Sequence, residues 1–526
     1  MKPKLLTIVL VLMTVVAMAQ NSKINVVNNE SPVGMDVKFQ KEIKAQEYVF
    51  PKRIHYIYVD TLSGYITLKL RKLSKNGKVL SISGTVLVFD QATHTVKWDK
   101  QMEFTSTDIQ PYQNFMTQTS GNKLFALNME NGEKLWTLKN DLYYLDHRHN
   151  IGIGYKYKGL AGNLHTLEGL DLRTGESLWE KELSRTYGWN SITTLNDSTL
   201  LIAASGLHTI NIHNGSGWDY NTVTGKKDYT ETVAKNAVGV TLGILTGTYL
   251  VATGANVVRD VVSNVILDSS YLYLASKESV SKLDRDSGQV LWTYPLSEEL
   301  SSRSYLVLRD SLLCVVNTGY AYLGGKKIDF GTPFILGLNP ETGAQQFYTL
   351  ISEKKDPISD FKIKNDSLVI VFKDRIANYG FYDGTQGSSK QFNTEELGEL
   401  TSFTGDRLYA KVGNQSYSPL QLLDTTKHYM HTSKSTVLAL DKQYNVTQTY
   451  DYDALFYCYG HVKDYKLLAK DGQTIVLDKL NNERANLNVS YKALTVGSTL
   501  YDFQEDRLLV VDLSSLFETN TDLEGF

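Results

Sequence analysis

Apolar and polar positions alternate over short stretches along most of the chain, and turn-forming residues separate these stretches. The segment "TTLNDSTLLIAASG" (193–206) has an apolar strand, an Asp-containing turn and a second apolar strand. Period-two alternation bounded by Asp, Asn, Gly or Ser is typical of β-hairpins. The same form recurs at 264–277, 305–319, 361–374 and 401–414.

A second hairpin element carries a fixed spacing of three residue types. In "LFALNMENGEKLW" (124–136) the strand ends in Asn128, Gly132 follows four residues later, and Trp136 follows eight residues later. The Asn side chain can close the turn, and Gly supplies the positive φ that such a loop needs. The spacing recurs at Asp171/Gly175/Trp179, Asp284/Gly288/Trp292 and Asn339/Gly343/Phe347, and imperfectly at Asp90/His94/Trp98 and Asn211/Gly215/Trp218.

The two hairpin elements together make a unit of four strands that repeats about every 40 residues. The markers at Asp90, Asn128, Asp171 and Asn211 give the period. Four antiparallel strands at this period predict the blades of an all-β propeller, and we expect eight blades. After residue 350 the repeat weakens, and Asp383, Asp441, Asp478 and Asp512 stand without the Gly or Trp.

One stretch breaks the alternation. Residues 237–258 contain no charge, and Gly239, Gly243 and Gly247 recur at a four-residue spacing. The markers on either side, Asn211 and Asp284, lie 73 positions apart, so we expect an insertion at 231–262 between two blades. A membrane span here would place the two groups of blades on opposite sides of the bilayer, so the ring could not close. We therefore expect no transmembrane segment.

Two conformations of the insertion remain open. As a helix, its three glycines lie near one face and allow another backbone to approach closely. As a strand pair, the alternation of Val238, Val240 and Leu242 is equally suitable. In either conformation the apolar surface packs on the propeller, or it is exposed and docks on a partner or a membrane surface.

Composition agrees with a folded, exported protein. Hydrophobic residues make up 42% of the chain and charged residues 21%, and the 33 Tyr favour strands. The N-terminus has two lysines, an apolar stretch and Ala17-Met18-Ala19, which is the pattern of a secretory signal at 1–19. No cysteine lies near the expected cleavage point, so we expect no lipid attachment. The net charge of −3, without basic clusters, argues against nucleic-acid partners.

Candidate catalytic and metal-binding patterns are weak. His147 and His149 have a spacing that can bind zinc on a strand, but no third ligand is close in the sequence, and a loop or strand without metal is the simpler interpretation. His428 and His431 lie in a stretch that we expect to be a loop. The acids of "DYDALF" (451–456) are typical of solvated strand ends. We expect Cys314 and Cys458 to be free and buried. No catalytic residue, metal site or cofactor site is assigned.

The repeated strand followed by D/N-x-x-x-G-x-x-x-W resembles the quinoprotein-like propeller repeat. That repeat occurs in PQQ-dependent alcohol dehydrogenases and in the propeller lipoprotein of the outer-membrane β-barrel assembly machinery. The resemblance covers residues 80–350 well and 351–526 weakly. It implies that the repeated aromatic docks between neighbouring blades, a role carried to Trp98, Trp136, Trp179, Trp218, Trp292 and Phe347. The adjacent cysteines that the dehydrogenases place over PQQ are absent, so we expect no cofactor.

These observations predict a signal at 1–19, a linker at 20–45 and a propeller at 46–526. The expected function is a non-catalytic scaffold or binding module that contacts envelope proteins, in the periplasm or at the outer-membrane periphery of a bacterium. The alternative is an enzyme or small-ligand binder that uses the central channel.

Overall fold

The fold is built almost entirely from antiparallel strands. Among the residues that it describes, the computed structural model has one α-helix, α2 (Thr394–Leu397), and one 3-10 helix (Ser514–Phe517). No helix of this part of the chain is long and apolar enough to cross a membrane. The structure describes residues 24–517 except 25, 75–76, 78, 105–106, 121–122, 158–164, 228–256, 324–325, 404–408, 413–414, 420–425, 452–456, 471 and 481.

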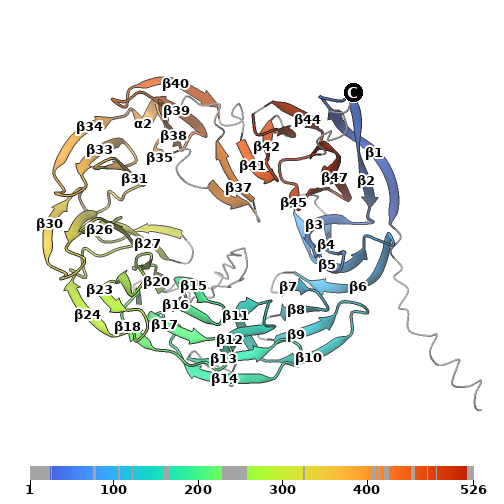
Figure 1. Ribbon diagram of the computed structural model, residues 1–526, viewed down its shortest axis with the longest axis horizontal. Coiled ribbons are helices and arrows are strands. Elements are labelled where there is room, and N and C mark those ends of the chain that lie inside the picture. The colour runs from blue at the N-terminus through green and yellow to red at the C-terminus, as the bar shows by residue number, and fades with distance from the viewer. Residues whose placement is uncertain are drawn as a thin grey trace, which may run out of the picture.

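Four-stranded sheets follow one another around a ring in chain order (Figure 1). The first four each use consecutive strands. The first sheet has β3 (Arg53–Val59), β4 (Tyr65–Leu73), β5 (Leu80–Asp90) and β6 (Thr95–Glu103), and the second has β7 (Thr107–Tyr112), β8 (Phe115–Ser120), β9 (Lys123–Asn128) and β10 (Lys134–Leu138). The third has β11 (Asn140–Asp146), β12 (Ile151–Lys156), β13 (Thr166–Asp171) and β14 (Ser177–Glu182). The fourth has β15 (Ser191–Asn196), β16 (Thr199–Ala203), β17 (Gly206–Asn211) and β18 (Asp219–Asn221).

Four more sheets continue the ring, two of them with insertions. They are β21 (Ile266–Leu267), β22 (Tyr271–Ala275), β23 (Ser279–Asp284) and β24 (Val290–Pro295); β25 (Ser304–Arg309), β26 (Leu312–Asn317), β29 (Phe334–Leu338) and β30 (Gln345–Leu350); β31 (Asp360–Lys364), β32 (Ser367–Val371), β33 (Arg375–Gly380) and β34 (Gln386–Gln391); and β35 (Leu400–Phe403), β38 (His428–Thr432), β39 (Thr436–Leu440) and β40 (Val446–Asp451).

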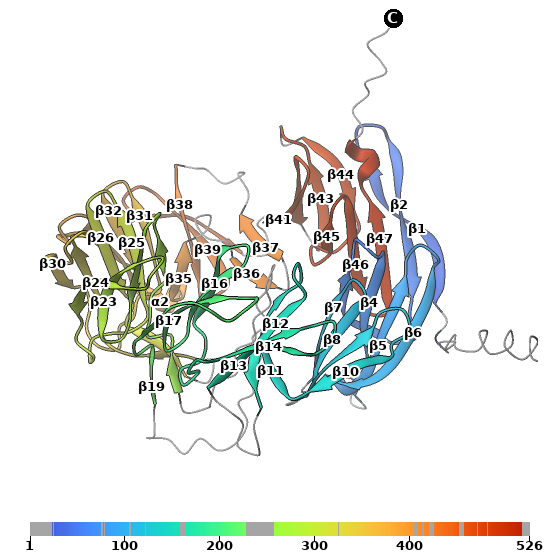
Figure 2. The same cartoon turned by 60° about the horizontal axis from the view of Figure 1, so that its bottom comes forward.

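The last part of the ring is one eleven-stranded sheet that unites both ends of the described chain. Its order is β36-β37-β41-β42-β43-β44-β1-β2-β47-β46-β45. In Figure 2 β43 to β47 stand together with β1 and β2 on the right, and β36, β37 and β41 lie nearer the middle. They are β36 (Tyr409–Val412), β37 (Gln415–Pro419), β41 (Tyr457–Val462), β42 (Tyr465–Lys470), β43 (Gln473–Leu477), β44 (Glu483–Leu487), β1 (Val27–Asp36), β2 (Lys41–Val49), β47 (Arg507–Asp512), β46 (Thr499–Gln504) and β45 (Leu494–Val496).

The propeller class is confirmed, but the number of four-strand groups differs from the eight blades that we expected. Eight separate sheets are joined by two further groups inside the eleven-stranded sheet, β41–β44 and β45–β47 with β2. The period undercounted them because the turn after β43 uses Asp478 without the Gly and Trp, and because the strand beside β47 is β2, from the other end of the chain. The turn after β39, in the eighth sheet, likewise uses Asp441 without the Gly and Trp. Asp441 and Asp478 instead accept hydrogen bonds from the backbone N–H groups of Asn445 and Asn482.

The stretch expected to be a linker carries strands in the structure. β1 and β2 form a hairpin, in which β2 pairs with β47 and β1 pairs with β44. Alternating buried positions such as Ile43 and Ala45 on β2 explain why this stretch joins the sheet. The ring is therefore closed by pairing the first strands with the last ones.

The inserted segments form a small sheet of their own. β19 (Gly225–Lys227) and β20 (Val257–Arg259) come from the insertion after β18, and β27 (Tyr320–Leu323) and β28 (Lys326–Asp329) come from an insertion between β26 and β29. β20 pairs with β27, so the two insertions meet. Asp260 ties this sheet to its surroundings, because it accepts from Asn190 Nδ2 (2.8 Å) and lies 3.5 Å from Arg303.

Candidate functional site

The repeated tryptophans lie at the contacts between consecutive sheets. Trp98 on β6 donates from Nε1 to the carbonyl of Met129 in the next sheet, at 2.7 Å. Every acceptor is the residue that follows an Asp or Asn marker, so the repeat spacing sets the partner. The other four donor–acceptor pairs are Trp136–Leu172 (3.0 Å), Trp179–Ile212 (2.7 Å), Trp218–Arg285 (2.9 Å) and Trp292–Pro340 (3.0 Å).

The glycine of each turn lies under the aromatic ring of the preceding sheet. A Cβ atom on the glycine would come closer than 3 Å to that ring in every case. The φ angles of these glycines are between 69° and 77°, a conformation that an L side chain disfavours. Glycine is therefore required twice, by the backbone and by the ring. The glycines and their rings are Gly132–Trp98, Gly175–Trp136, Gly215–Trp179, Gly288–Trp218 and Gly343–Trp292.

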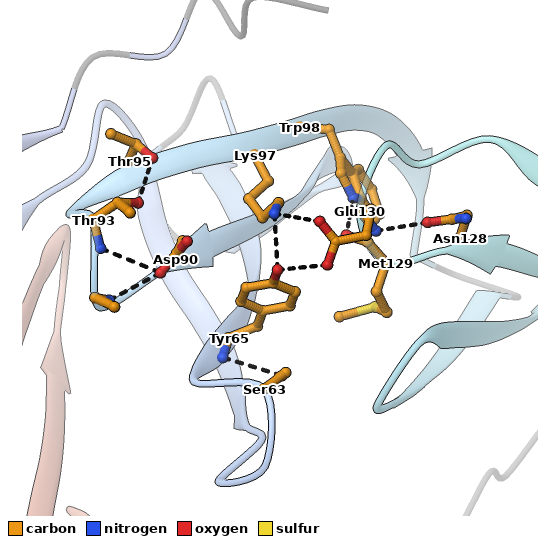
Figure 3. A network of polar contacts seen from close by, with 11 residues as sticks. Ser63, Tyr65, Asp90, Thr93, Thr95, Lys97, Trp98, Asn128, Met129 and Glu130 are labelled. Carbon is orange, nitrogen blue, oxygen red and sulfur yellow. Dashed lines mark hydrogen bonds and ion pairs between the residues drawn. The ribbon is translucent and has the colours of Figure 1, made fainter. Parts of the chain in front are cut away.

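Figure 3 shows the contact between Trp98 and Met129 together with its polar neighbours. Lys97 contacts Glu130 across the two sheets, and the Tyr65 hydroxyl donates to Glu130 at 2.5 Å. The hydrogen bond from Lys97, followed by that from Tyr65, lowers the pKa of the Glu130 carboxyl. Beside them, Asn128 Oδ1 accepts from the Glu130 N–H at 2.7 Å and holds the turn that carries the Trp98 acceptor.

The same contact continues past residue 350. Phe347 lies against Gly384, whose φ is 66°. The sequence reasoning missed Gly384 because Gly380 occupies the marker position and Asp383 stands three residues later. The Gly384 N–H donates to the Gly380 carbonyl, as the Gly132 N–H does to Asn128. A marker read as "D, N or G" would have found it.

A further aromatic contact lies where the chain closes on itself. Tyr48 on β2 is 1% exposed, and its hydroxyl lies 2.7 Å from His94 Nδ1. His94 stands at the glycine position of the first repeat and has φ 57°. Tyr48 thus occupies the aromatic position opposite it. Burial, with a smaller contribution from Tyr501, raises the pKa of Tyr48 to about 12.

The sixth tryptophan has a different environment. Trp189 is 2% exposed and donates from Nε1 to the Tyr155 hydroxyl at 3.0 Å. Arg185 lies over the Tyr155 ring at 4.7 Å and donates to Asp141 at 2.5 Å. Burial raises the pKa of Tyr155, so its phenol stays neutral beside the paired guanidinium of Arg185. It packs the strands β11 and β12 against the connection to β15.

A groove of about 530 Å³ lies among β3, β41 and β45, which are the first strands of three four-strand groups. This size is in the range of small-ligand and peptide sites. Asp60 is the one carboxylate among its described lining residues, and its oxygens accept from the Leu62 N–H (3.0 Å) and the Ser63 hydroxyl (2.7 Å). The lining is Tyr56, Ile57, Tyr58, Val59, Asp60, Thr67, Pro111, Tyr459, Gly460, His461, Leu494, Thr495, Val496 and Gly497.

The histidine pairs do not converge on a metal. His147 stacks on Tyr112 with ring centroids 4.2 Å apart, whereas His149 lies 3.2 Å from Asp146. His428 and His431 lie on strand β38 and not in a loop, and three residues of strand place them on opposite faces. Within the part of the chain that the structure describes, no three His, Cys, Asp or Glu side chains could hold a metal ion together.

The cysteines and the glycine-rich insertion complete the expected positions. Cys314 is free and buried, and burial raises the pKa of its thiol to about 12. The side chain of Cys458 lies outside the described residues, as do Gly239, Gly243 and Gly247 and the segment 451–456 except for the backbone of Asp451. Both flanks of the insertion are described, because Lys227 pairs with Val257.

One comparison with known proteins matches part of the chain to a family. Residues 71–294 match the family model described as outer membrane protein assembly factor BamB. The search of curated proteins found no match to the chain.

Several solved structures are similar at low identity. BamB from Moraxella catarrhalis is 14% identical, with 72% of this chain and 95% of that chain covered and a TM-score of 0.31. Apo AztD from Citrobacter koseri is 9% identical, with 70% and 91% covered and a TM-score of 0.30. The computationally designed Ika8 protein is 12% identical, with 74% and 96% covered and a TM-score of 0.28. The match to the family model confirms the resemblance to the quinoprotein-like propeller repeat, at residues 71–294.

Proposed function

We propose that this chain is an exported, non-catalytic propeller that binds protein partners in the cell envelope. The observation that carries the proposal is the match of residues 71–294 to the family model of an outer-membrane assembly factor. The secretory pattern at 1–19 supports export, and the absence of a cysteine after Ala19 supports a protein without a lipid anchor.

We also infer that the repeated aromatics hold neighbouring sheets together. Each of the five tryptophans joins one sheet to the next by a hydrogen bond to a backbone carbonyl and by contact with a glycine. This gives a rigid frame whose loops and inner strands are available for partners. A rigid frame suits a scaffold, because binding then costs little conformational entropy.

The absence of a catalytic role is supported by the groove. Its one described carboxylate, Asp60, is engaged by its own turn, and its one imidazole is that of His461. A general acid–base pair needs two titratable groups aimed at the same reacting atom. The central-channel alternative remains the competing function, and it uses the same groove.

The apolar insertion is the second candidate contact for a partner. Its flanking strands β19 and β20 pair from Gly225–Arg259 to Lys227–Val257, so the chain leaves and returns at neighbouring positions. Residues 228–256 can therefore be replaced by a two-residue Asn-Gly turn without separating β19 from β20. Residues 257–262 must be kept, because Val258 and Val261 are buried.

The test is in-cell cross-linking and co-purification with the full protein and with this replacement variant, after both are shown to be folded. An envelope protein captured by the full chain and lost with the variant supports a docking insertion. Equal capture by the full protein and the variant would mean that the partner contacts the ring and not the insertion. Cell fractionation of the full chain tests export, and recovery in the cytoplasm with residues 1–19 intact contradicts it. Capture of nothing by either form favours the channel-ligand alternative.

A further inference from the structure

The groove among β3, β41 and β45 is bordered by end strands of sheets. The inference drawn from this rests on the proposed function and specifies how a partner would bind. β3 and β45 are the end strands of their sheets as described. An end strand presents backbone N–H and C=O groups that can pair with an added strand. The groove therefore offers main-chain hydrogen-bonding groups as well as side chains.

The pairing of β3 with β4 identifies which groups these are. The Asp60 N–H donates to the Tyr65 carbonyl at 2.9 Å, so Asp60 belongs to a hydrogen-bonded pair. Hydrogen-bonded positions alternate along an antiparallel strand. The N–H and C=O groups of Val59 and Ile57 therefore point away from β4. Both residues line the groove.

The group β41–β44 already carries an added strand at the corresponding edge. The hairpin β36–β37 is inserted between β35 and β38, yet β37 pairs antiparallel with β41, at Ser418–Cys458 and Pro419–Tyr457. β41 then continues into the groove through Tyr459, Gly460 and His461. Strand addition at a first strand is thus a geometry that this fold uses within its own chain.

The side chains that line the groove indicate which kind of segment could bind there. Tyr56 and Tyr58 lie on one side with ring centroids 4.8 Å apart, and Leu494 and Val496 line the other side. The described lining contains one carboxylate, Asp60, and no Lys or Arg. We propose that the groove binds an extended, neutral-to-basic polypeptide segment of a partner protein, which adds as a strand to the inner edge of β3. Its main chain pairs with Ile57 and Val59, and its alternate apolar side chains contact the aromatic and aliphatic walls.

The test uses a random nine-residue peptide library, displayed on phage and selected on the full-length protein. The strongest binder is synthesised, and its affinity is measured for the wild type, Val59→Pro and Val59→Ala. Proline removes the N–H that points into the groove, at an end strand where proline is tolerated, whereas alanine keeps it. We expect Val59→Pro to weaken binding about tenfold or more and Val59→Ala to change it far less. N-methylation of the peptide should weaken binding only at every second residue.

A second variant, Gly460→Leu, allows the inference to be tested if Val59→Pro does not fold. A Cβ at Gly460 would make only ordinary contacts, the nearest at 3.5 Å, so Gly460→Leu should fold and fill the groove. Loss of peptide binding in Gly460→Leu supports the inference. It is overturned if no peptide is enriched, if both variants bind like the wild type, or if N-methylation has no alternating effect.

Co-purification separates this inference from the proposed function. If an envelope partner is captured equally by the wild type and Val59→Pro, the groove inference fails and the scaffold function stands. If the wild type captures no partner, the scaffold function fails whatever the peptide result.

Discussion

At the scale of single residues, the five tryptophans explain why this repeat tolerates so little change at two of its positions. An indole has one N–H donor and a flat face, and here the donor meets a backbone carbonyl while the face covers a glycine. Phe347 keeps only the second contact, against Gly384. The residue pair, and not the tryptophan alone, is therefore the unit that joins two sheets.

The glycine half of this pair can be tested against a matched position. Gly215 and Gly64 both have φ 73°, but a Cβ at Gly215 would meet Trp179 whereas nothing lies within 4 Å of a Cβ at Gly64. Both Gly→Ala changes carry the cost of a left-handed alanine, about 1–2 kcal/mol. We expect Gly215→Ala to lower the free energy of unfolding by a further ~1–3 kcal/mol from overpacking, measured by urea denaturation. Equal losses in the two variants would contradict a role for the ring contact.

His431 gives a prediction for acid stability. The side chain is 7% exposed, and burial lowers its pKa from 6.5 to about 4. Between these two values the unfolded chain binds a proton at His431 that the folded chain does not bind, so the free energy of unfolding falls as the pH decreases from 6.5 towards 4. The loss amounts to about 3 kcal/mol at most.

We expect His431→Gln to flatten this part of the curve of unfolding free energy against pH. The exposed His213 provides the control, and His213→Gln should leave the curve unchanged. An unchanged slope between pH 6.5 and 4 in His431→Gln would show that other groups cause the acid sensitivity.

At the scale of secondary-structure elements, the hairpin β1–β2 is the piece with no counterpart in the repeat. β2 serves as the outer strand of the last four-strand group, and β1 bridges β2 and β44. Asp36 at the end of β1 lies 3.4 Å from Arg484 on β44, and both side chains are at most 8% exposed. A buried pair of this kind specifies which strands meet more than it stabilises them.

The contact of β1 with β44 can be disturbed at one residue. A Cβ on Gly34 would collide with the Asn486 carbonyl and the Leu487 side chain. Overpacking of this kind costs about 1–3 kcal/mol. We expect Gly34→Ala to increase hydrogen exchange of the β1 amides about tenfold or more, with β7–β10 unchanged. Ser31→Ala, on β1 but away from the β1–β44 register, is the control. Protection of β1 equal to that of the wild type would mean that β44 does not hold it.

The sequence was informative for elements where one residue type marks one position. The Asp–Gly–Trp spacing located the turns from residue 128 to 343, because a positive φ and a ring above it leave few alternatives to glycine. Where other residues make the turn, as Tyr444 does with φ 63° between β39 and β40, the pattern was lost. Tyr48 was missed for another reason, since β2 carries no marker of the repeat and completes a group whose other strands, β45–β47, come from the far end of the chain. The groove was also not predictable, because its walls come from strands at both ends of the chain.

At the scale of the whole molecule, the insertion leaves the ring intact. Trp218 precedes the insertion and Arg285 follows it, yet they share a hydrogen bond of 2.9 Å. The sheets β15–β18 and β21–β24 are therefore neighbours in the ring. The small sheet β19-β20-β27-β28 does not stand between them.

Replacing residues 228–256 by Asn-Gly should consequently leave the ring as stable as before. We expect the midpoint of thermal unfolding to change by no more than about 1 °C, a shift that corresponds to about 1 kcal/mol in a protein of this size. A clear drop in the midpoint would mean that the segment packs against the ring. In that case Trp218→Phe should add little further loss, whereas in the intact protein it removes one buried hydrogen bond.

The hairpin β1–β2 also makes the start of the chain depend on its last strands. Asp36 and Arg484 are separated by 448 positions, so the first strands to leave the ribosome must wait for almost the last ones. A chain cut short before β44 exposes the edges of β1 and β2 and offers them to proteases. Only a chain that has reached both β44 and β47 can cover these two edges.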